Sequence, residues 1–212
     1  MNVGIVALGD SILDNDESWA YWLGRASGLP LTRLAVGGAK SPDVLDQLPL
    51  LDGHSYEIAC IAVGTNDVLL AWDPIRFADN LAVVVAAASD CADRVVAQTI
   101  PLGLRQFPGG GQQVRRRVER ANAIVEGSGA LVVAGEDLRA PRLMATDRIH
   151  PSTQGQLLLA DRAAKLLGIE PRPSSLHDGS RDFARGAYLR DTCQLTAKGI
   201  LKRALRYPPP AS

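Results

Sequence analysis

The sequence is poor in cysteine, histidine and aromatic residues, which argues against several kinds of site. Its 212 residues include three cysteines, three histidines and two methionines, and aromatic residues make up 5%. The cysteines, Cys60, Cys91 and Cys193, have neither the Cys-x-x-Cys spacing of a redox pair nor the spacing of metal ligands, so we expect no metal and no cofactor. Their odd number favours reduced thiols in a reducing compartment.

Long apolar runs and targeting signals are also missing. The longest apolar run, Leu81–Ala88, is far shorter than the ~20 residues that span a bilayer. The N-terminus lacks a basic segment followed by a cleavage site of small residues. We therefore expect no membrane span, no signal peptide and a cytoplasmic location.

The sequence has no net charge, because 23 Lys and Arg residues balance 23 Asp and Glu residues. This balance argues against a nucleic-acid-binding protein, which is normally basic. The charges are nevertheless distributed unevenly: residues 1–170 hold 15 basic and 20 acidic side chains, and residues 171–212 hold 8 and 3. We expect the basic end to pack on the body or on a second subunit as a homodimer, in preference to contacting an anionic surface.

Five short runs of apolar or β-branched residues are typical of strands that a parallel sheet buries on both faces. Helical patterns lie between and after them. This alternation predicts a doubly wound α/β sandwich. The strands are expected at residues 3–8, 31–36, 58–63, 94–99 and 130–135, and the helices at residues 17–27, 42–51, 74–89, 112–126 and 152–168.

The last helical segment has recognisable ends. Thr153 and Gln156 predict a capping box at its start, and Gly168 predicts its end. After it the alternation stops at the stretch IEPRPSS. We therefore predict one domain over residues 1–170 and a basic, helical extension over residues 171–212.

Glycine and polar residues follow the predicted strands at the edge where doubly wound sheets hold their sites. GDS follows the first strand, GGAKS the second and GTND the third, and DRIHP follows the fifth after an irregular stretch. Each stretch alone is an ordinary turn or helix cap. Their joint placement at one edge indicates a functional site.

This set contains what acyl transfer requires. Ser11 supplies a hydroxyl group, His150 can take its proton, and Asp147 can orient the imidazole and stabilise its charged form. The backbone N–H groups of Ser11 and Gly38 and the side-chain amide of Asn66 are candidate donors to the oxyanion.

These four blocks resemble the SGNH, or GDSL-type, hydrolase superfamily, and they follow the family's order over about residues 3–168. The resemblance implies a three-layer α/β/α, flavodoxin-like fold with a five-stranded parallel sheet. It also implies a metal-free serine hydrolase that acts on small-molecule esters, sometimes thioesters or acylated sugars. Ser11 would be the nucleophile, His150 and Asp147 the base and its orienting partner, and Gly38 and Asn66 oxyanion donors.

Some neighbours of the motif residues are expected to be structural, and one departs from the family. Asp10 and Asp67 are interpreted as scaffold residues. Arg33 stands near the position where the family's second block often has Asn. The glycine-rich stretch 103–117 lacks the Gly-Lys-Ser/Thr of a P-loop. We interpret it as a mobile loop beside the site, with Arg115 to Arg117 on the solvated face of the helix that it enters.

Other functions stay open at this stage. The chain has no Gly-x-Ser-x-Gly motif, which argues against the other common α/β hydrolase fold. The complete set of motif residues favours catalysis over a non-catalytic flavodoxin-like module, and an acyltransferase would use the same residues. A chain with few long insertions favours a short acyl group, whereas the natural substrate and the choice between ester and thioester are left open.

Overall fold

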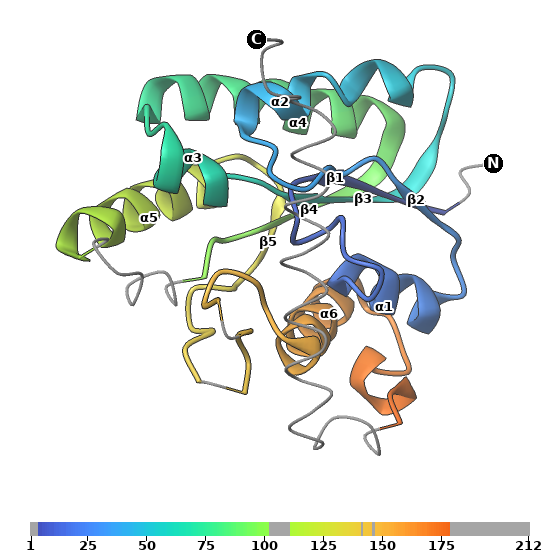
Figure 1. Ribbon diagram of the computed structural model, residues 1–212. Helices are drawn as coiled ribbons and strands as arrows, with labels where there is room; N and C mark the ends of the chain where they lie inside the picture. Colours follow the sequence, from blue (N-terminus) through green and yellow to red (C-terminus); the bar gives the residue numbers. More distant parts are fainter. Residues whose placement is uncertain (1–3, 102–110, 141, 146, 179–212) are drawn as a thin grey trace, which may run out of the picture.

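The computed structural model describes residues 4–101, 111–140, 142–145 and 147–178. Its centre is a sheet of five parallel strands in the order β2-β1-β3-β4-β5 (Figure 1). The prediction of a five-stranded parallel sheet is therefore confirmed. The strands are β1 (Ile5–Gly9), β2 (Leu31–Arg33), β3 (Tyr56–Ala62), β4 (Ala92–Gln98) and β5 (Leu131–Val133).

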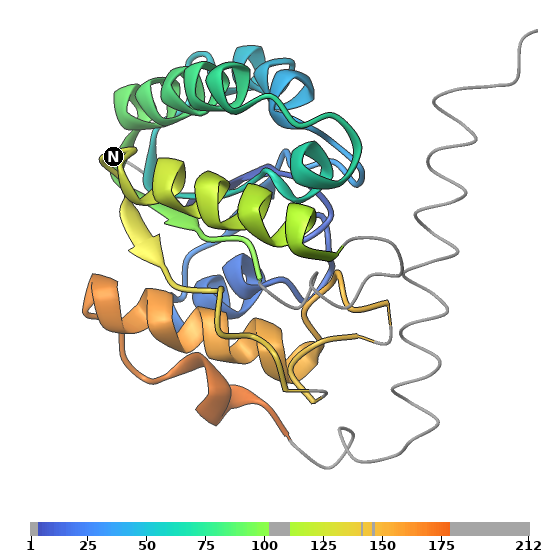
Figure 2. The same ribbon diagram turned by 90° about the vertical axis from the view of Figure 1, so that its left-hand side faces the viewer.

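Helices cover both faces of this sheet and make a three-layer sandwich (Figure 2). On one face lie α1 (Trp19–Ser27) and α6 (Thr153–Leu167). On the other lie α2 (Ser41–Leu45), α4 (Pro74–Cys91) and α5 (Gly111–Glu126). The side chains of β1 alternate between the two cores, since Ile5 faces the first and Val6 the second.

Two shorter elements and one split refine the sequence prediction. The GTND stretch begins an additional helix, α3 (Thr65–Leu70), for which Gly64 is the N-cap residue. The predicted helix at residues 42–51 is divided into α2 and the 3-10 helix η1 (Leu48–Leu51). Both α3 and η1 lie on the same side of the sheet as α4 and α5, since η1 packs against α4 and α3 against α5.

The capping box predicted at the start of α6 is wrong. The N-cap residue is Ser152, whose Oγ accepts a hydrogen bond of 3.2 Å from the N–H of Gly155. Gln156 instead turns into the core, where it is 1% exposed and bonds to a distant segment. The predicted end of the helix is confirmed, because Gly168 has the left-handed φ of 68° that favours glycine.

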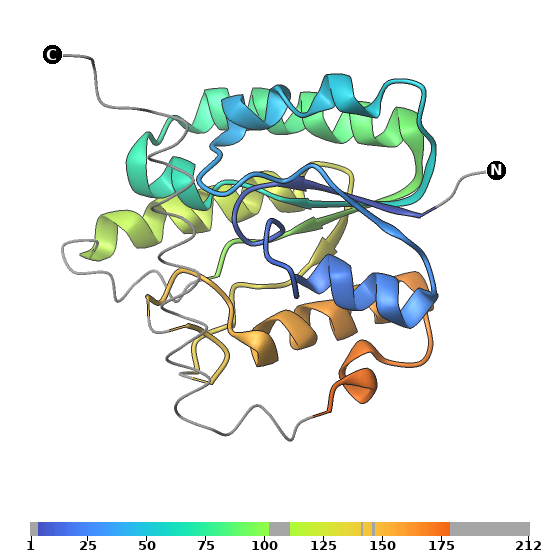
Figure 3. The ribbon, with the colours of Figure 1, turned by 45° about the vertical axis from the view of Figure 1, so that its right-hand side comes forward.

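After α6 the described chain continues through a second 3-10 helix, η3 (Pro173–Leu176), which lies against α1 and α6 (Figure 3). Residues 179–212 of the predicted extension and residues 103–110 of the glycine-rich stretch lie outside the described residues. Within the described part of the chain, no helix is both long enough and apolar enough to cross a membrane.

Candidate active site

Ser11 lies in the turn that immediately follows β1, at the carboxyl edge of the sheet. Gly9 closes the strand with a φ of 136°, and a Cβ atom there would lie 1.9 Å from the carbonyl oxygen of Ala62. The N–H of Asp10 donates to that same oxygen at 2.9 Å. Only glycine permits this approach of β1 to β3, so the strand ends at a fixed place and the next residues turn outward.

Two buried glutamines hold the backbone on either side of this turn. Gln47 accepts from the N–H of Gly9 at 2.9 Å and donates to its carbonyl oxygen at 2.9 Å. Gln156 accepts from the N–H of Trp19 at 2.9 Å and donates to the carbonyl oxygen of Ile12 at 3.3 Å. Each amide satisfies one backbone donor and one backbone acceptor in the interior, which makes these contacts expensive to lose.

Asp147 builds the turn that carries His150. Its Oδ1 accepts hydrogen bonds from the N–H groups of Ile149, at 2.9 Å, and His150, at 3.0 Å. Arg148, between Asp147 and Ile149, adopts a φ of 58°, a left-handed conformation that non-glycine residues seldom take. The carbonyl oxygen of His150 accepts from the N–H of Ala145 at 2.8 Å. The turn therefore rests mostly on bonds among its own residues.

The two turns meet in a continuous chain of hydrogen bonds. Ser11 Oγ lies 2.7 Å from His150 Nε2, and His150 Nδ1 lies 2.6 Å from Asp147 Oδ2. Because a carboxylate can only accept, the neutral imidazole carries its proton on Nδ1 and donates it to Asp147. Nε2 is then free to accept from the Ser11 hydroxyl. The three residues that the sequence singled out for proton transfer are thus brought together.

The electrostatics of this chain favour an ionised Asp147 and a basic His150. For His150, burial opposes the charged form, but the hydrogen bond and charge of Asp147, with a contribution from Asp10, outweigh it and raise the pKa. For Asp147, burial acts in the opposite direction to the hydrogen bonds from His150 and Ile149, and the net result is a lowered pKa. The two groups stabilise each other's charged forms.

The Gly37–Gly38 segment lies beside Ser11. A Cβ atom on Gly37 would come within 3.9 Å of Ser11 Cβ, and the N–H of Gly37 donates to Asp14 Oδ2 at 2.8 Å. Gly38 follows with a φ of 83°. The N–H groups of Ser11 and Gly38 donate to no other residue in the part of the chain that the structure describes.

Asn66 approaches the same segment from the start of α3. Its Nδ2 donates to the carbonyl oxygen of Ala39 at 2.9 Å, which leaves the second hydrogen of the amide for another acceptor. This bond ties the loop after β3 to the loop after β2. Three predicted site residues, Ser11 and Gly38 from two loops and Asn66 from the start of α3, are thus linked through neighbouring contacts.

The sequence also matches the GDSL-like lipase/acylhydrolase family over residues 7–158. The chain belongs to this family. Membership makes it an ester hydrolase, and the matched residues include β1, the Gly37–Gly38 segment, Asn66 and the Asp147–His150 turn. A comparison with curated proteins finds no match.

Solved structures with the GDSL-family fold superpose on most of the chain. A lipolytic protein of the G-D-S-L family from Veillonella parvula has a TM-score of 0.63 at 17% identity, covering 78% of this chain and 98% of that one. An acetylxylan esterase from Geobacillus stearothermophilus has a TM-score of 0.62 at 18% identity, and the match covers 80% of this chain and 98% of that one. A psychrotrophic esterase from Pseudoalteromonas has a TM-score of 0.61 at 21% identity, and the match covers 79% of this chain and 97% of that one. The predicted three-layer fold is confirmed.

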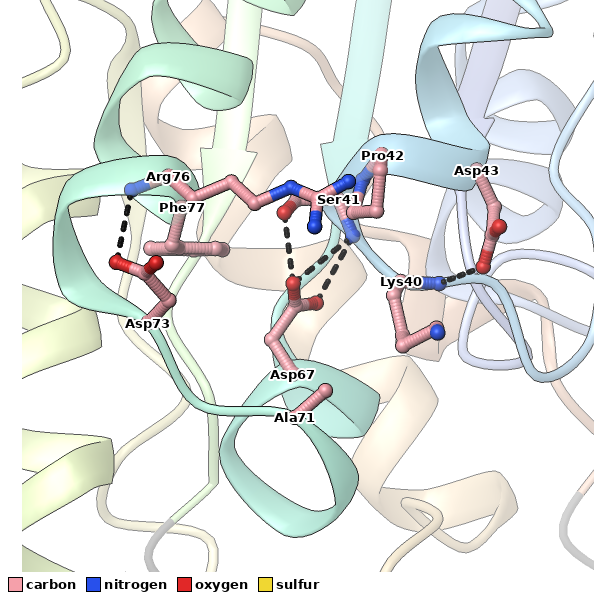
Figure 4. Close-up of a pocket in the computed structure, with 9 residues that line it drawn as sticks. All are labelled: Lys40, Ser41, Pro42, Asp43, Asp67, Ala71, Asp73, Arg76 and Phe77. Carbon is pink, nitrogen blue, oxygen red and sulfur yellow. Dashed lines mark hydrogen bonds between the residues drawn. The ribbon is translucent and has the colours of Figure 1, made fainter.

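In this GDSL-family protein Asp67 ties the loop after β3 to the start of α2 (Figure 4). Its carboxylate accepts from the Ser41 N–H, at 2.9 and 3.0 Å, and from the Ser41 hydroxyl at 2.6 Å. Burial raises its pKa, against the hydrogen bonds from Ser41. Asp67 also lines a hollow of about 200 Å³ that lies between α2 and α4. These contacts agree with a scaffold role.

Arg33 stands where GDSL-type hydrolases often have Asn, and it pairs with Asp16 at 3.0 Å. Gln47 and Gln156 are positioning residues that the sequence did not indicate. Glutamine is common in every kind of element, and only the fold reveals that these two side chains reach backbone at the ends of the Ser11 segment. In the described residues, no three His, Cys, Asp or Glu side chains lie close enough together to hold a metal ion.

Proposed function

We propose that this protein hydrolyses short-chain carboxylic esters through an acyl-enzyme on Ser11. The observation that carries the proposal is the pair of short contacts, 2.7 Å from Ser11 Oγ to His150 Nε2 and 2.6 Å from His150 Nδ1 to Asp147 Oδ2. A serine hydroxyl that donates to a neutral imidazole, itself oriented by a carboxylate, is the arrangement that activates a nucleophile.

In the first half-reaction Ser11 Oγ attacks the carbonyl carbon of the ester while its proton passes to His150 Nε2. The imidazolium that forms is stabilised by Asp147, whose pKa is lowered and which therefore stays ionised at neutral pH. Collapse of the tetrahedral intermediate breaks the bond to the alcohol oxygen. The leaving alkoxide takes the proton from Nε2, and the acyl group remains on Ser11.

In the second half-reaction His150 removes a proton from water, and the hydroxide attacks the acyl carbon. Collapse returns the proton to Ser11 Oγ and releases the carboxylic acid. In both halves the negative oxygen would be held by the N–H groups of Ser11 and Gly38 and by the Asn66 amide. Each preorganised donor of this kind contributes about 3–4 kcal/mol to the barrier reduction in other hydrolases.

The preference for a short acyl group rests on the size of the chain, which has few long insertions from which to build a deep lipid pocket. The acetylxylan esterase among the similar structures makes an acetylated xylooligosaccharide a reasonable substrate to include in a test. An acyltransferase would share the first half-reaction and differ only in the acceptor that attacks the acyl-enzyme.

The test is hydrolysis of p-nitrophenyl acetate, butyrate and octanoate by the wild type, Ser11→Ala and Ser55→Ala, which alters an exposed serine. We expect acetate to give the highest kcat/KM, Ser11→Ala to lose at least about 10⁴-fold and Ser55→Ala to be unchanged. Trapping of an acyl group on Ser11, detected by mass spectrometry, would identify the intermediate.

Three other outcomes would redirect the proposal. Full turnover in Ser11→Ala would show that another residue is the nucleophile. A wild type that is folded but inactive on every ester, the acetylated oligosaccharide included, would favour the non-catalytic module. Transfer of the acyl group to an added alcohol in preference to water would favour the acyltransferase.

A further inference from the structure

Asp10, between Gly9 and Ser11, is a completely buried carboxyl group that the proposed reaction leaves without a role. Its side chain is 0% exposed. Oδ1 accepts one hydrogen bond, of 3.0 Å, from the N–H of Ile12, and Oδ2 has no partner among the described residues. A carboxylate without compensating partners is expensive to bury, so its place next to Ser11 requires an explanation.

The bonded oxygen fixes the turn on which Ser11 stands. Asp10 Oδ1 holds the N–H of Ile12, while the backbone carbonyl oxygen of Asp10 accepts from the N–H groups of Leu13, at 3.2 Å, and Asp14, at 3.0 Å. The residue therefore gathers three consecutive backbone donors beyond Ser11. These three bonds fix the backbone of the turn that carries Ser11.

When the Asp10 carboxyl group is ionised, its charge interacts with three other titratable groups. His150, from the turn before α6, favours the ionised form of Asp10, whereas Asp67 from α3 and Asp14 from the same loop disfavour it. Burial is the largest influence and raises the pKa of Asp10 to about 7. In return, the charge of Asp10 is one of the causes that raise the pKa of His150.

We propose that Asp10 is a positioning residue for the Ser11–His150 pair: its Oδ1 holds the turn that presents Ser11 Oγ to His150 Nε2, and its buried, unpartnered Oδ2 places a negative charge next to that pair, which favours the proton on His150. This second role rests on the proposed function, in which His150 must be neutral to accept the proton of Ser11. Asp10 itself neither touches the substrate nor transfers a proton in the reaction.

The charge of Asp10 acts on His150 in one direction only. Where Asp10 is protonated, it places no charge near His150, and only Asp147 favours the proton on the imidazole. As the pH rises through the range in which Asp10 ionises, the new negative charge holds the remaining proton on His150. Two coupled groups then titrate in overlapping steps, so the wild type approaches its maximal rate gradually. Without the charge, His150 titrates in one step and at lower pH.

The experiment compares the wild type with Asp10→Asn, which keeps an oxygen for the Ile12 N–H and removes the charge. Asp52→Asn, at an exposed position, is the matched control. We expect the acid limb of kcat/KM against pH to become narrower and to move to lower pH in Asp10→Asn alone. Asp10→Ala, which also lacks the acceptor, should show the same shift with at least about a tenfold lower plateau.

Nuclear magnetic resonance provides a readout that does not need turnover. In the wild type, the Asp10 carboxyl carbon should titrate near neutral pH, and the His150 ring should titrate more broadly than in Asp10→Asn. An Asp10 carboxyl that titrates like an exposed aspartate, or a His150 titration that is identical in the two proteins, would overturn the proposal. A shifted His150 titration in a protein that hydrolyses no ester would support Asp10's effect on His150 and contradict the proposed function.

Discussion

The two turns that meet at the site are held in different ways. Both turns are closed by their own aspartate, but the Ser11 turn is also tied to distant parts of the fold, because Gln47 and Gln156 bond its flanks from other parts of the chain and Gly9 packs against Ala62. The Asp147–His150 turn is held largely by its own carboxylate, and the side chains of Asp147 and His150 are 24% and 22% exposed.

This difference separates stability from catalysis. The position of Ser11 depends on buried contacts to distant parts of the domain, so the loss of one of these contacts should lower the free energy of unfolding. The position of His150 depends on a local turn, so a change there should alter the reaction while the domain stays folded. Each variant below tests one side of this comparison.

The largest effect is expected at His150. His150→Ala removes the base, and since base and nucleophile act as a unit, kcat/KM should fall at least about 10⁴-fold. The melting temperature should move little. The Ser11→Ala/His150→Ala double variant should be hardly slower than either single variant, which steady-state kinetics would check. If the loss of kcat/KM in the double variant equalled the product of the two single losses, the two residues would act independently.

Asp147→Asn should give the next largest effect. An amide oxygen can keep the bonds to the Ile149 and His150 N–H groups, but the amide nitrogen would then face His150 Nδ1 and favour the wrong tautomer. We expect kcat/KM to fall roughly 10³–10⁴-fold at neutral pH. Thermal unfolding should distinguish this variant from Asp147→Ala, which also loses the turn. A large loss of stability in Asp147→Asn would contradict the separation described above.

The sequence predicts the catalytic edge better than it predicts its supports. The five strands and the blocks after them are visible because apolar runs and glycine-containing turns each have a local pattern. Gln156 shows why the supports are not visible: its spacing from Thr153 suits a capping box, and tertiary contacts to Ile12 and Trp19 override that local role. Long-range bonds of this kind leave no periodicity in the sequence.

Gln156→Met tests the buried side of the comparison. The substitution keeps the length of the side chain and leaves the Trp19 N–H and the Ile12 carbonyl oxygen buried without partners. Each of these two groups costs about 1–3 kcal/mol, so the free energy of unfolding should fall by roughly 2–6 kcal/mol. Urea denaturation would measure this, with Gln112→Met, at an exposed position on α5, as the control. An equal loss in both variants would assign the effect to something other than the two bonds.

Asp10 should make stability depend on pH in a direction opposite to that of a salt-bridged carboxylate. The folded protein keeps the proton up to a pKa of about 7, whereas the unfolded chain releases it near the ordinary aspartate pKa of 3.8. Folded molecules bind more protons between these values, so stability is lost as the pH rises. Between about pH 4.5 and 6.5 the wild type should lose roughly 2–3 kcal/mol relative to Asp10→Asn. Urea denaturation at each pH would measure this. A difference in the free energy of unfolding between the two proteins that does not change with pH would contradict the prediction.

The smallest effect is expected from an exposed contact on the same segment that Gln156 holds. Arg33 pairs with Asp16, whose side chain is 71% exposed, and water screens such a pair. Arg33→Ala should therefore lower the free energy of unfolding by no more than about 1 kcal/mol and leave kcat/KM unchanged, in parallel with Gln156→Met. Arg33 and Gln156 both make their contacts with the segment 12–19, and the two contacts differ chiefly in burial. If Arg33→Ala were as damaging as Gln156→Met, burial would not be the reason that the Ser11 side of the site is tied to the stability of the fold.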